Sequence, residues 1–95
     1  MLNISVSQSF DQRKQNSGIP LIDVRTPAEY GSIHADGAVN HPMESLELEK
    51  IPFSKEEEIH VICQSGGRSM KVSQKLEAAG FTNVVNVEGG TSAWH

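Results

Sequence analysis

Short apolar runs alternate along the chain with longer, more polar stretches, and this alternation predicts strands and helices in turn. Four runs have the length of buried strands, at residues 3–6, 21–24, 59–62 and 84–87. A fifth short strand is expected after the turn at Asp36 and Gly37, and Pro42 ends it. Strands that alternate with helices predict an α/β domain with a mainly parallel sheet.

The clearest helix start lies at residues 26–30. Thr26 is the expected N-cap, Pro27 occupies the first helical position, and Glu29 completes a capping box. Gly31 and Ser32 are expected to end this helix after roughly two turns.

Three weaker helical patterns are also present. Residues 7–15 predict a modest helix with Ser5 or Ser7 as its N-cap. Residues 43–49 suit a short surface helix, and residues 91–94 resemble a helix that has only begun.

A further helix is expected to start at Ser69, shortly after the only cysteine of the chain. Met70, Leu76 and Ala79 have spacings compatible with one buried face, and Gly80 is a good terminator. The cysteine itself, Cys63, follows directly on the expected strand 59–62. Ligand sites of parallel sheets lie beyond the carboxyl ends of the strands, so Cys63 stands where a site is expected.

The segment between this strand and this helix, called the cysteine loop below, has the composition of an anion-binding turn. It reads Cys63-Gln64-Ser65-Gly66-Gly67-Arg68-Ser69. The glycines allow successive backbone N–H groups to point inward, and the helix start adds partial positive charge. Such surroundings favour the thiolate, which is the reactive form of cysteine. A buried core cysteine is the simpler alternative, but it requires neither two glycines nor an arginine nearby, so the pattern favours nucleophilic chemistry at Cys63.

Composition narrows the function classes. A length of 95 residues fits one domain. The net charge of −4, from 12 acidic and 8 basic residues, provides no basic footprint, so no nucleic-acid partner is expected. One cysteine forms no internal disulfide and no thiolate zinc site, which indicates a reducing compartment. No apolar run approaches the ~20 residues of a membrane helix, and the polar start is unlike a signal peptide. We therefore expect a cytoplasmic chain, or the cytosolic part of a longer protein, with no membrane segment of its own.

Four motifs occur in the order known from one protein family. They are the cysteine loop at 63–69, residues 21–25 with Glu29 and Tyr30, residues 33–42, and residues 87–90 with Trp94. Together they resemble the single-domain rhodaneses, which are sulfurtransferases. The resemblance implies a three-layer α/β fold over residues 1–95, with about five strands and helices on both faces. Family members continue past the tryptophan with another helix, so an excised domain with a shortened C-terminal helix is expected.

The resemblance also implies a mechanism. Cys63 attacks the outer sulfur of a small donor of the thiosulfate or mercaptopyruvate type and becomes a persulfide. Backbone N–H groups from Gln64 to Ser69 hold that sulfur, and Arg68 adds positive charge. An acceptor then removes the sulfur: cyanide in an assay, a thiol or a protein in the cell. The reaction is covalent catalysis with ping-pong kinetics, and no metal or other cofactor is implied.

Two kinds of alternative function are distinguished from sulfur transfer, one by the length of the cysteine loop and the other by the absence of turnover. Cysteine-dependent phosphatases place five residues between cysteine and arginine, whereas four separate Cys63 from Arg68 here, which disfavours phosphatase and arsenate-reductase activity. A rhodanese-like module that carries sulfur or senses redox state without turnover is the main alternative. Ser65 and Glu29 stand where two-domain thiosulfate enzymes carry a lysine and an arginine, which argues against efficient use of thiosulfate.

Several other polar residues are weaker candidates. Asp23 and Arg25 flank a strand end and either tune the pocket or, as we favour, form a structural ion pair. The run at 56–58 is expected to be a solvated acidic stretch, and Trp94 is expected to brace the cysteine loop. The histidines share no metal-ligand spacing and are expected at surface or turn positions; they are His34, His41, His60 and His95.

Overall fold

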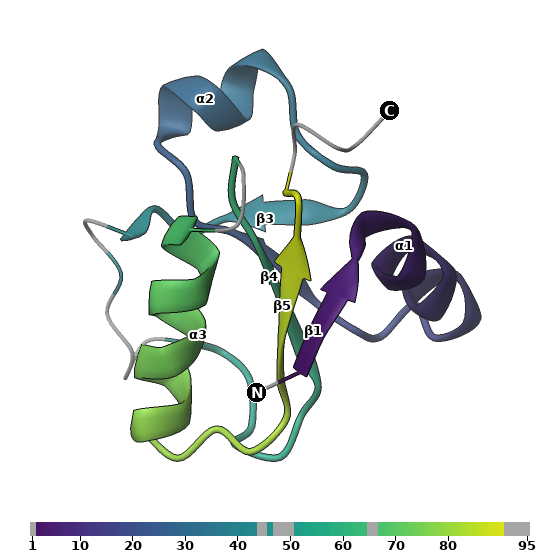
Figure 1. Ribbon diagram of the computed structural model, residues 1–95, viewed down its shortest axis with the longest axis vertical. Coiled ribbons are helices and arrows are strands. Elements are labelled where there is room, and N and C mark those ends of the chain that lie inside the picture. The colour runs from purple at the N-terminus through teal and green to yellow at the C-terminus, as the bar shows by residue number, and fades with distance from the viewer. Residues whose placement is uncertain (1, 44–45, 47–50, 65–66, 91–95) are drawn as a thin grey trace.

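The computed structural model, described for residues 2–43, 46, 51–64 and 67–90, contains one five-stranded sheet (Figure 1). The strands are β1 (Leu2–Ser5), β2 (Leu21–Asp23), β3 (Ala38–Asn40), β4 (Ile59–Ile62) and β5 (Val84–Glu88). Their order across the sheet is β1-β5-β4-β2-β3, and all neighbouring strands run parallel. The helices are α1 (Val6–Gln15), α2 (Pro27–Ser32) and α3 (Gly67–Ala78). The expected α/β fold with a parallel sheet is confirmed.

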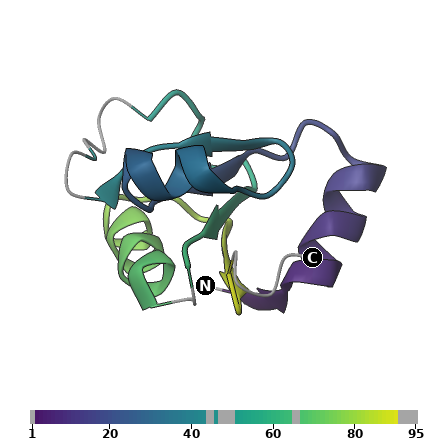
Figure 2. The same cartoon turned by 90° about the horizontal axis from the view of Figure 1, so that it is seen from above.

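Helices cover both faces of this sheet. Figure 2 shows α1 and α3 on opposite sides of the strands, and Figure 1 shows α2 beyond the end to which β5 points. Strand β4 is buried over its whole length, and its side chains alternate between the two faces. Ile59 and Val61 belong to the core cluster under α3, whereas Ile62 belongs to the second cluster. A central strand between two apolar layers is thereby fixed in register.

Local signals predicted the helix ends well. Thr26 caps α2 and forms a capping box with Glu29, as expected. Ser5, not Ser7, is the N-cap of α1, where it forms a capping box with Gln8. Gly80 follows the end of α3 with φ +100°, a conformation that favours glycine. The helices expected at 43–49 and 91–94 fall largely or wholly outside the described residues.

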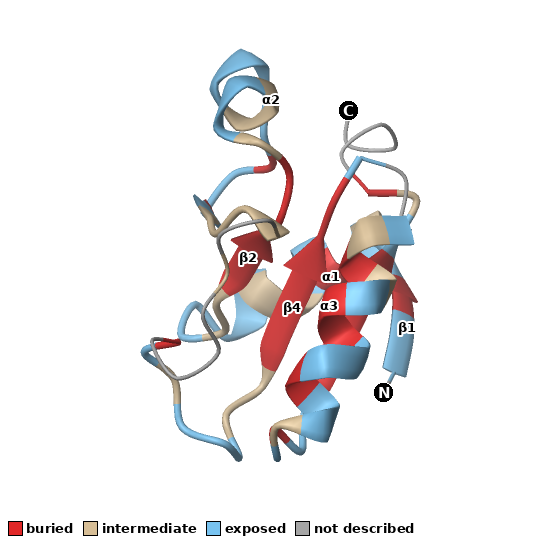
Figure 3. Cartoon of the chain, turned by 90° about the vertical axis from the view of Figure 1, so that its left-hand side faces the viewer, coloured by how far each residue is buried: buried red, intermediate tan, exposed pale blue. Residues whose placement is uncertain are grey.

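The buried face of α3 differs from the expected one. Leu76 is buried, but Met70 and Ala79 are only half-buried. The residues that face the sheet are Ser69, Val72, Ser73 and Leu76, which Figure 3 shows as the buried strip of the helix. Their spacing of three and four residues follows the helical repeat, and two of them are serines that an apolar pattern does not detect.

His60 was wrongly expected at the surface. It lies in the middle of β4 with no exposed area, and its ring joins two other elements. Nδ1 lies 2.7 Å from the Ser9 Oγ atom on α1, and Nε2 lies 2.7 Å from a Glu58 carboxylate oxygen. Because a carboxylate only accepts, Nε2–H donates to Glu58, and in the neutral ring Nδ1 accepts from the Ser9 hydroxyl. The Ser9 oxygen in turn accepts from Nε of Arg13. The expectation that residues 56–58 are only a solvated acidic stretch is therefore wrong for Glu58, which binds the buried His60 ring.

No helix among the described residues is long and apolar enough to cross a membrane.

We predict that His60 makes the fold sensitive to mild acid. Burial lowers the pKa of His60 below its ordinary value of 6.5, outweighing the opposite effect of Glu58. His60 therefore takes up a proton near pH 6.5 in the unfolded chain but only at lower pH in the folded chain. The free energy of unfolding falls as the pH drops below 6.5. The slope from this group is at most about 1.4 kcal/mol per pH unit. Urea unfolding measured between pH 7.5 and 5 should show this decrease in the free energy of unfolding.

Two variants provide the comparison. His60→Gln should flatten the profile, whereas His34→Gln, which changes an exposed histidine, should leave it as in the unaltered chain. An equal flattening in both variants would contradict the assignment to His60.

Candidate active site

Cys63 lies at the carboxyl end of the central strand and is the first residue after β4. Its side chain is 1% exposed and belongs to the core cluster that packs under α3. The Sγ atom lies 3.4 Å from the Oγ atom of Ser69, which is fully buried in the first turn of α3. The strand and the helix start therefore meet at the thiol, as the sequence predicts.

The rest of the cysteine loop is described in part. Gln64 and the α3 residues Gly67, Arg68 and Ser69 are described, whereas Ser65 and Gly66 are not. At this edge of the sheet Gln64 contacts Arg25, Arg68 contacts Glu29, and Ser69 contacts Cys63. Inward-pointing N–H groups of the two undescribed residues stay a prediction.

Gly90 packs directly against the start of the loop. Its φ is +57°, and a Cβ atom built there would lie 2.2 Å from the carbonyl oxygen of Cys63. The same atom would lie 2.7 Å from the carbonyl carbon and oxygen of Gln64. Both the backbone conformation and the close approach require glycine. The turn after β5 thus supports the backbone of Cys63, a role for which the sequence provides only the glycine pair at 89–90.

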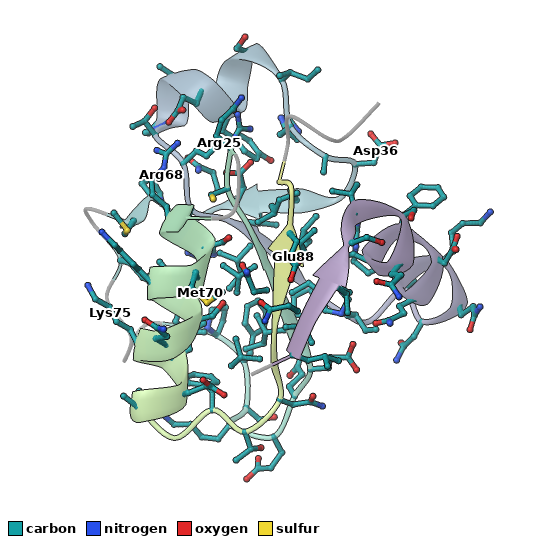
Figure 4. All side chains as sticks on the ribbon, viewed as in Figure 1. Arg25, Asp36, Arg68, Met70, Lys75 and Glu88 are labelled. Carbon is teal, nitrogen blue, oxygen red and sulfur yellow. The ribbon has the colours of Figure 1, made fainter. Side chains whose placement is uncertain are left out.

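A buried ion pair lies beside the loop. Arg25 is 1% exposed and Asp23 is fully buried, and the Arg25 Nη2 atom lies 2.8 Å from an Asp23 carboxylate oxygen. Nη2 also donates to the carbonyl oxygen of Ile33 at the end of α2, and Nη1 donates to the Gln64 side-chain oxygen over 3.4 Å. The structure thus contains the expected ion pair and extends it to the residue after Cys63. Figure 4 shows Arg25 below α2.

Asn40 holds the backbone around this pair. Its Nδ2 atom donates to the carbonyl oxygens of Asp23 and Arg25, both at 3.0 Å. These bonds link the end of β3 to the end of β2, so the ion pair sits on a fixed backbone. The sequence contains Asn40 in one of its motifs but no pattern that assigns it this contact.

Arg68 pairs with Glu29 across the site. The guanidinium Nη1 and Nη2 atoms lie 2.8 Å and 3.0 Å from the two Glu29 carboxylate oxygens, a bidentate arrangement. These bonds, followed by the bond from the Thr26 backbone, lower the pKa of Glu29 to about 2. Glu29 is therefore an anion in neutral solution, and its charge offsets much of the positive charge that Arg68 brings to the loop.

The arrangement suits a nucleophilic thiol at the start of a helix, beside the Ser69 hydroxyl. The free N–H groups and dipole at the start of a 12-residue helix favour a thiolate at Cys63. The Ser69 hydroxyl can donate to that thiolate. Of the nearby cations, Arg25 pairs with Asp23 and Arg68 pairs with Glu29, so each of these positive charges is offset by a carboxylate. Among the described residues, no group of three histidine, cysteine or carboxylate side chains is placed to hold a metal ion.

The chain is similar to known proteins over almost all of its length. Residues 6–95 match the sequence profile of the family described as Rhodanese-like domain. Thiosulfate sulfurtransferase 16, chloroplastic, of Arabidopsis thaliana is 41% identical over 90 residues, covering 82% of this chain and 75% of that protein. A sulfurtransferase of Allochromatium vinosum is 32% identical over 95 residues, covering 99% and 89%. The crystal structure of a rhodanese-like domain protein from Staphylococcus aureus superposes with a TM-score of 0.89 at 33% identity, covering 100% and 92%.

We predict that Gly90→Ala displaces the loop. The added methyl group overlaps with the backbone of Cys63 and Gln64, at a cost of about 1–3 kcal/mol in the free energy of unfolding. The buried thiol should then alkylate faster with iodoacetamide in the folded protein. Gly31→Ala is the matched control, because a Cβ atom there meets nothing within 4 Å. Equal alkylation rates in the two variants would argue against a supporting role for Gly90.

We also predict an acid-sensitive contribution from the Glu29–Arg68 pair. Its stabilisation is complete above the ordinary Glu29 pKa of 4.5 and is lost as the pH falls towards about 2. Glu29→Gln retains a residue that can complete the capping box but removes the charge. This variant should lose less stability than the unaltered chain between pH 5 and 3, measured by urea unfolding. Glu56→Gln, at an exposed position, should behave like the unaltered chain.

Proposed function

Because the chain belongs to the family of rhodanese-like domains, we propose that it transfers sulfane sulfur through a persulfide at Cys63. Its relatives support a sulfurtransferase or sulfur-carrier function in general. The observation that carries the specific proposal is the position of the Cys63 thiol, at a strand end, beside the Ser69 hydroxyl in the first turn of α3. A thiol in this position is a nucleophile held in a single orientation.

The first half-reaction loads the enzyme. The Cys63 thiolate attacks the outer sulfur of a donor of the thiosulfate or mercaptopyruvate type, and a bond forms between Sγ and that sulfur. The bond between this sulfur and the rest of the donor breaks, and its electron pair leaves with sulfite or with the pyruvate enolate. The negative charge on the terminal sulfur of the persulfide is then stabilised by backbone N–H groups of residues 64–69.

The second half-reaction unloads it. An acceptor nucleophile attacks the terminal sulfur, and the Cys63 thiolate leaves as the sulfur–sulfur bond breaks. Cyanide is the acceptor in an assay, and a thiol or a protein is the acceptor in the cell. No oxidant or reductant is consumed, so the two steps require no metal or redox cofactor.

The charge arrangement bears on the donor. Arg68 is held by Glu29, so a dianion such as thiosulfate must compete with a carboxylate that already occupies both guanidinium Nη atoms. Thiosulfate then serves as a donor in vitro, but inefficiently. We further propose that residues 1–95 form one domain that works in a reducing compartment such as the cytoplasm, because Cys63 must remain a free thiol.

Intact-mass measurement tests the persulfide. Fully reduced protein incubated with thiosulfate or mercaptopyruvate should gain about 32 Da, the mass of one sulfur, and the gain should disappear after cyanide is added. Cys63→Ser should gain nothing. Absence of the adduct with both donors would refute the proposal.

Two further outcomes identify the alternatives. Formation of the adduct without steady turnover to cyanide would indicate a sulfur carrier or redox sensor. Hydrolysis of an aryl phosphate that requires Cys63 would indicate a phosphatase, which the four-residue spacing between Cys63 and Arg68 disfavours.

A further inference from the structure

One side of α3 carries a row of basic residues, of which Lys71 and Lys75 take no part in the proposed reaction. Arg68, Lys71 and Lys75 follow each other at intervals of three and four residues and therefore share one side of the helix. Lys71 and Lys75 are exposed, whereas Ser69, Val72, Ser73 and Leu76 face the sheet. Figure 4 shows Lys75 directed away from the sheet, and Figure 3 shows the exposed side of the helix. We call Lys71 and Lys75, together with Lys55, the lysine ridge.

Lys55 adds a third lysine at the C-terminal end of the helix. Its Nζ atom donates to the carbonyl oxygen of Ala79 over 2.7 Å and lies 4.3 Å from the centre of the Phe81 ring. The lysine ridge thus comprises two lysines on α3 and one beside the residues that follow the helix.

The ridge differs in charge from the rest of the chain. The whole sequence has 12 acidic and 8 basic residues, whereas α3 contains one acidic residue, Glu77. Among the described residues, no carboxylate lies within ion-pair distance of Lys71 or Lys75. Arg68 is different, because Glu29 binds it on both Nη atoms. The uncompensated positive charge therefore lies on the lysines.

This arrangement costs the helix stability. Like charges four residues apart repel by roughly 0.2–0.5 kcal/mol, and Lys71 and Lys75 are such a pair. Arg68 and Lys71 also lie in the N-terminal half of the helix, where carboxylates are favoured by the helix dipole. α3 has no acidic residue in its first turn. Glu29 compensates Arg68, and Lys75 lies in the last turn, where the dipole favours a cation. Lys71 is therefore the residue that breaks the local rule without a compensating contact among the described residues. Such a break is expected where a residue serves a function other than stability.

The position of the ridge connects it to the site. Arg68 precedes Ser69, whose hydroxyl contacts the Cys63 sulfur, so the helix that carries the ridge begins at the thiol. With a rise of about 1.5 Å per residue, Lys71 and Lys75 lie about 5 Å and about 10 Å further along the axis than Arg68. A small anionic donor reacting at Cys63 is too short to contact Lys75 at the same time. An extended partner that reaches the thiol can contact both lysines.

We propose that the lysine ridge docks a protein sulfur acceptor that carries an acidic segment next to its nucleophilic thiol. This inference rests on the proposed sulfur transfer from Cys63. Carboxylates of the acceptor pair with the lysines, and its thiolate then lies beside the persulfide at the start of α3. The pairing accelerates encounter and loses strength in salt. A protein fits better than a nucleic acid, because the net charge of −4 repels a long polyanion beyond the small basic area.

Single-turnover transfer to defined peptides tests the ridge. Protein preloaded with sulfur and freed of donor is mixed with a peptide in which glutamates precede one cysteine, or with its glutamine counterpart. We expect transfer to the glutamate peptide to be roughly three- to tenfold faster at low salt, with the difference lost at high salt. The double variant Lys71→Gln/Lys75→Gln should lose this difference while it transfers sulfur to dithiothreitol as fast as the unaltered chain.

The matched control is Lys14→Gln, an exposed lysine on α1 at the opposite face of the sheet, which should retain the preference for glutamate. If Cys63 takes up no sulfur, the proposed function is wrong, and the docking inference that rests on it is wrong as well. If sulfur loads but both peptides react equally, or Lys14→Gln has the same effect as the double variant, the docking inference is wrong. Stronger competition by a single-stranded oligonucleotide than by free polyglutamate would overturn the choice of a protein partner.

Discussion

The buried ion pair between Asp23 and Arg25 organises the carboxyl edge of the sheet. Both side chains are almost fully removed from water, so each charge depends on the other, and loss of one partner typically costs about 3–5 kcal/mol. Through the remaining donors of its guanidinium group, Arg25 holds the end of α2 at Ile33 and the residue after Cys63. One pair thus connects the end of β2 to the end of α2, eight residues away, and to Gln64, 39 residues away, and the candidate site lies among these segments.

Near the thiol the cationic side chains are neutralised by carboxylates, whereas the exposed lysines lie further along α3. Arg25 and Arg68 are each bound to a carboxylate, and the Ser69 hydroxyl at the start of α3 contacts the Cys63 sulfur. Lys71 and Lys75, which have no such partner among the described residues, point outward from the same helix. In our proposal α3 serves both steps: its first turn holds the persulfide, and its exposed side receives the acceptor.

Patterns of neighbouring residues predicted most of the fold. The alternation of strand and helix signals led to the parallel sheet, the capping box at Thr26 placed α2, and β4 covers the expected residues 59–62. Errors arose where a polar side chain is buried. His60 occupies a core position because Ser9 and Glu58 satisfy its two ring nitrogens, and those partners come from elsewhere in the structure or from a run that looks solvated. The serines on the buried side of α3 were missed for a similar reason.

The sequence by itself determined the position of Cys63 after a strand and before a helix, and the resemblance of its loop to a sulfur-binding one. These features depend on residues close together in the chain, where propensity, capping and spacing act directly. Only the tertiary structure decided that Glu29 binds Arg68, that Gly90 supports the backbone of Cys63, and that Arg25 reaches Gln64. Gly90 and Cys63 are 27 residues apart in the chain, and the residues of each of the other two pairs are 39 apart. Such contacts exist only once the parallel strands have brought their carboxyl ends together at one edge of the sheet.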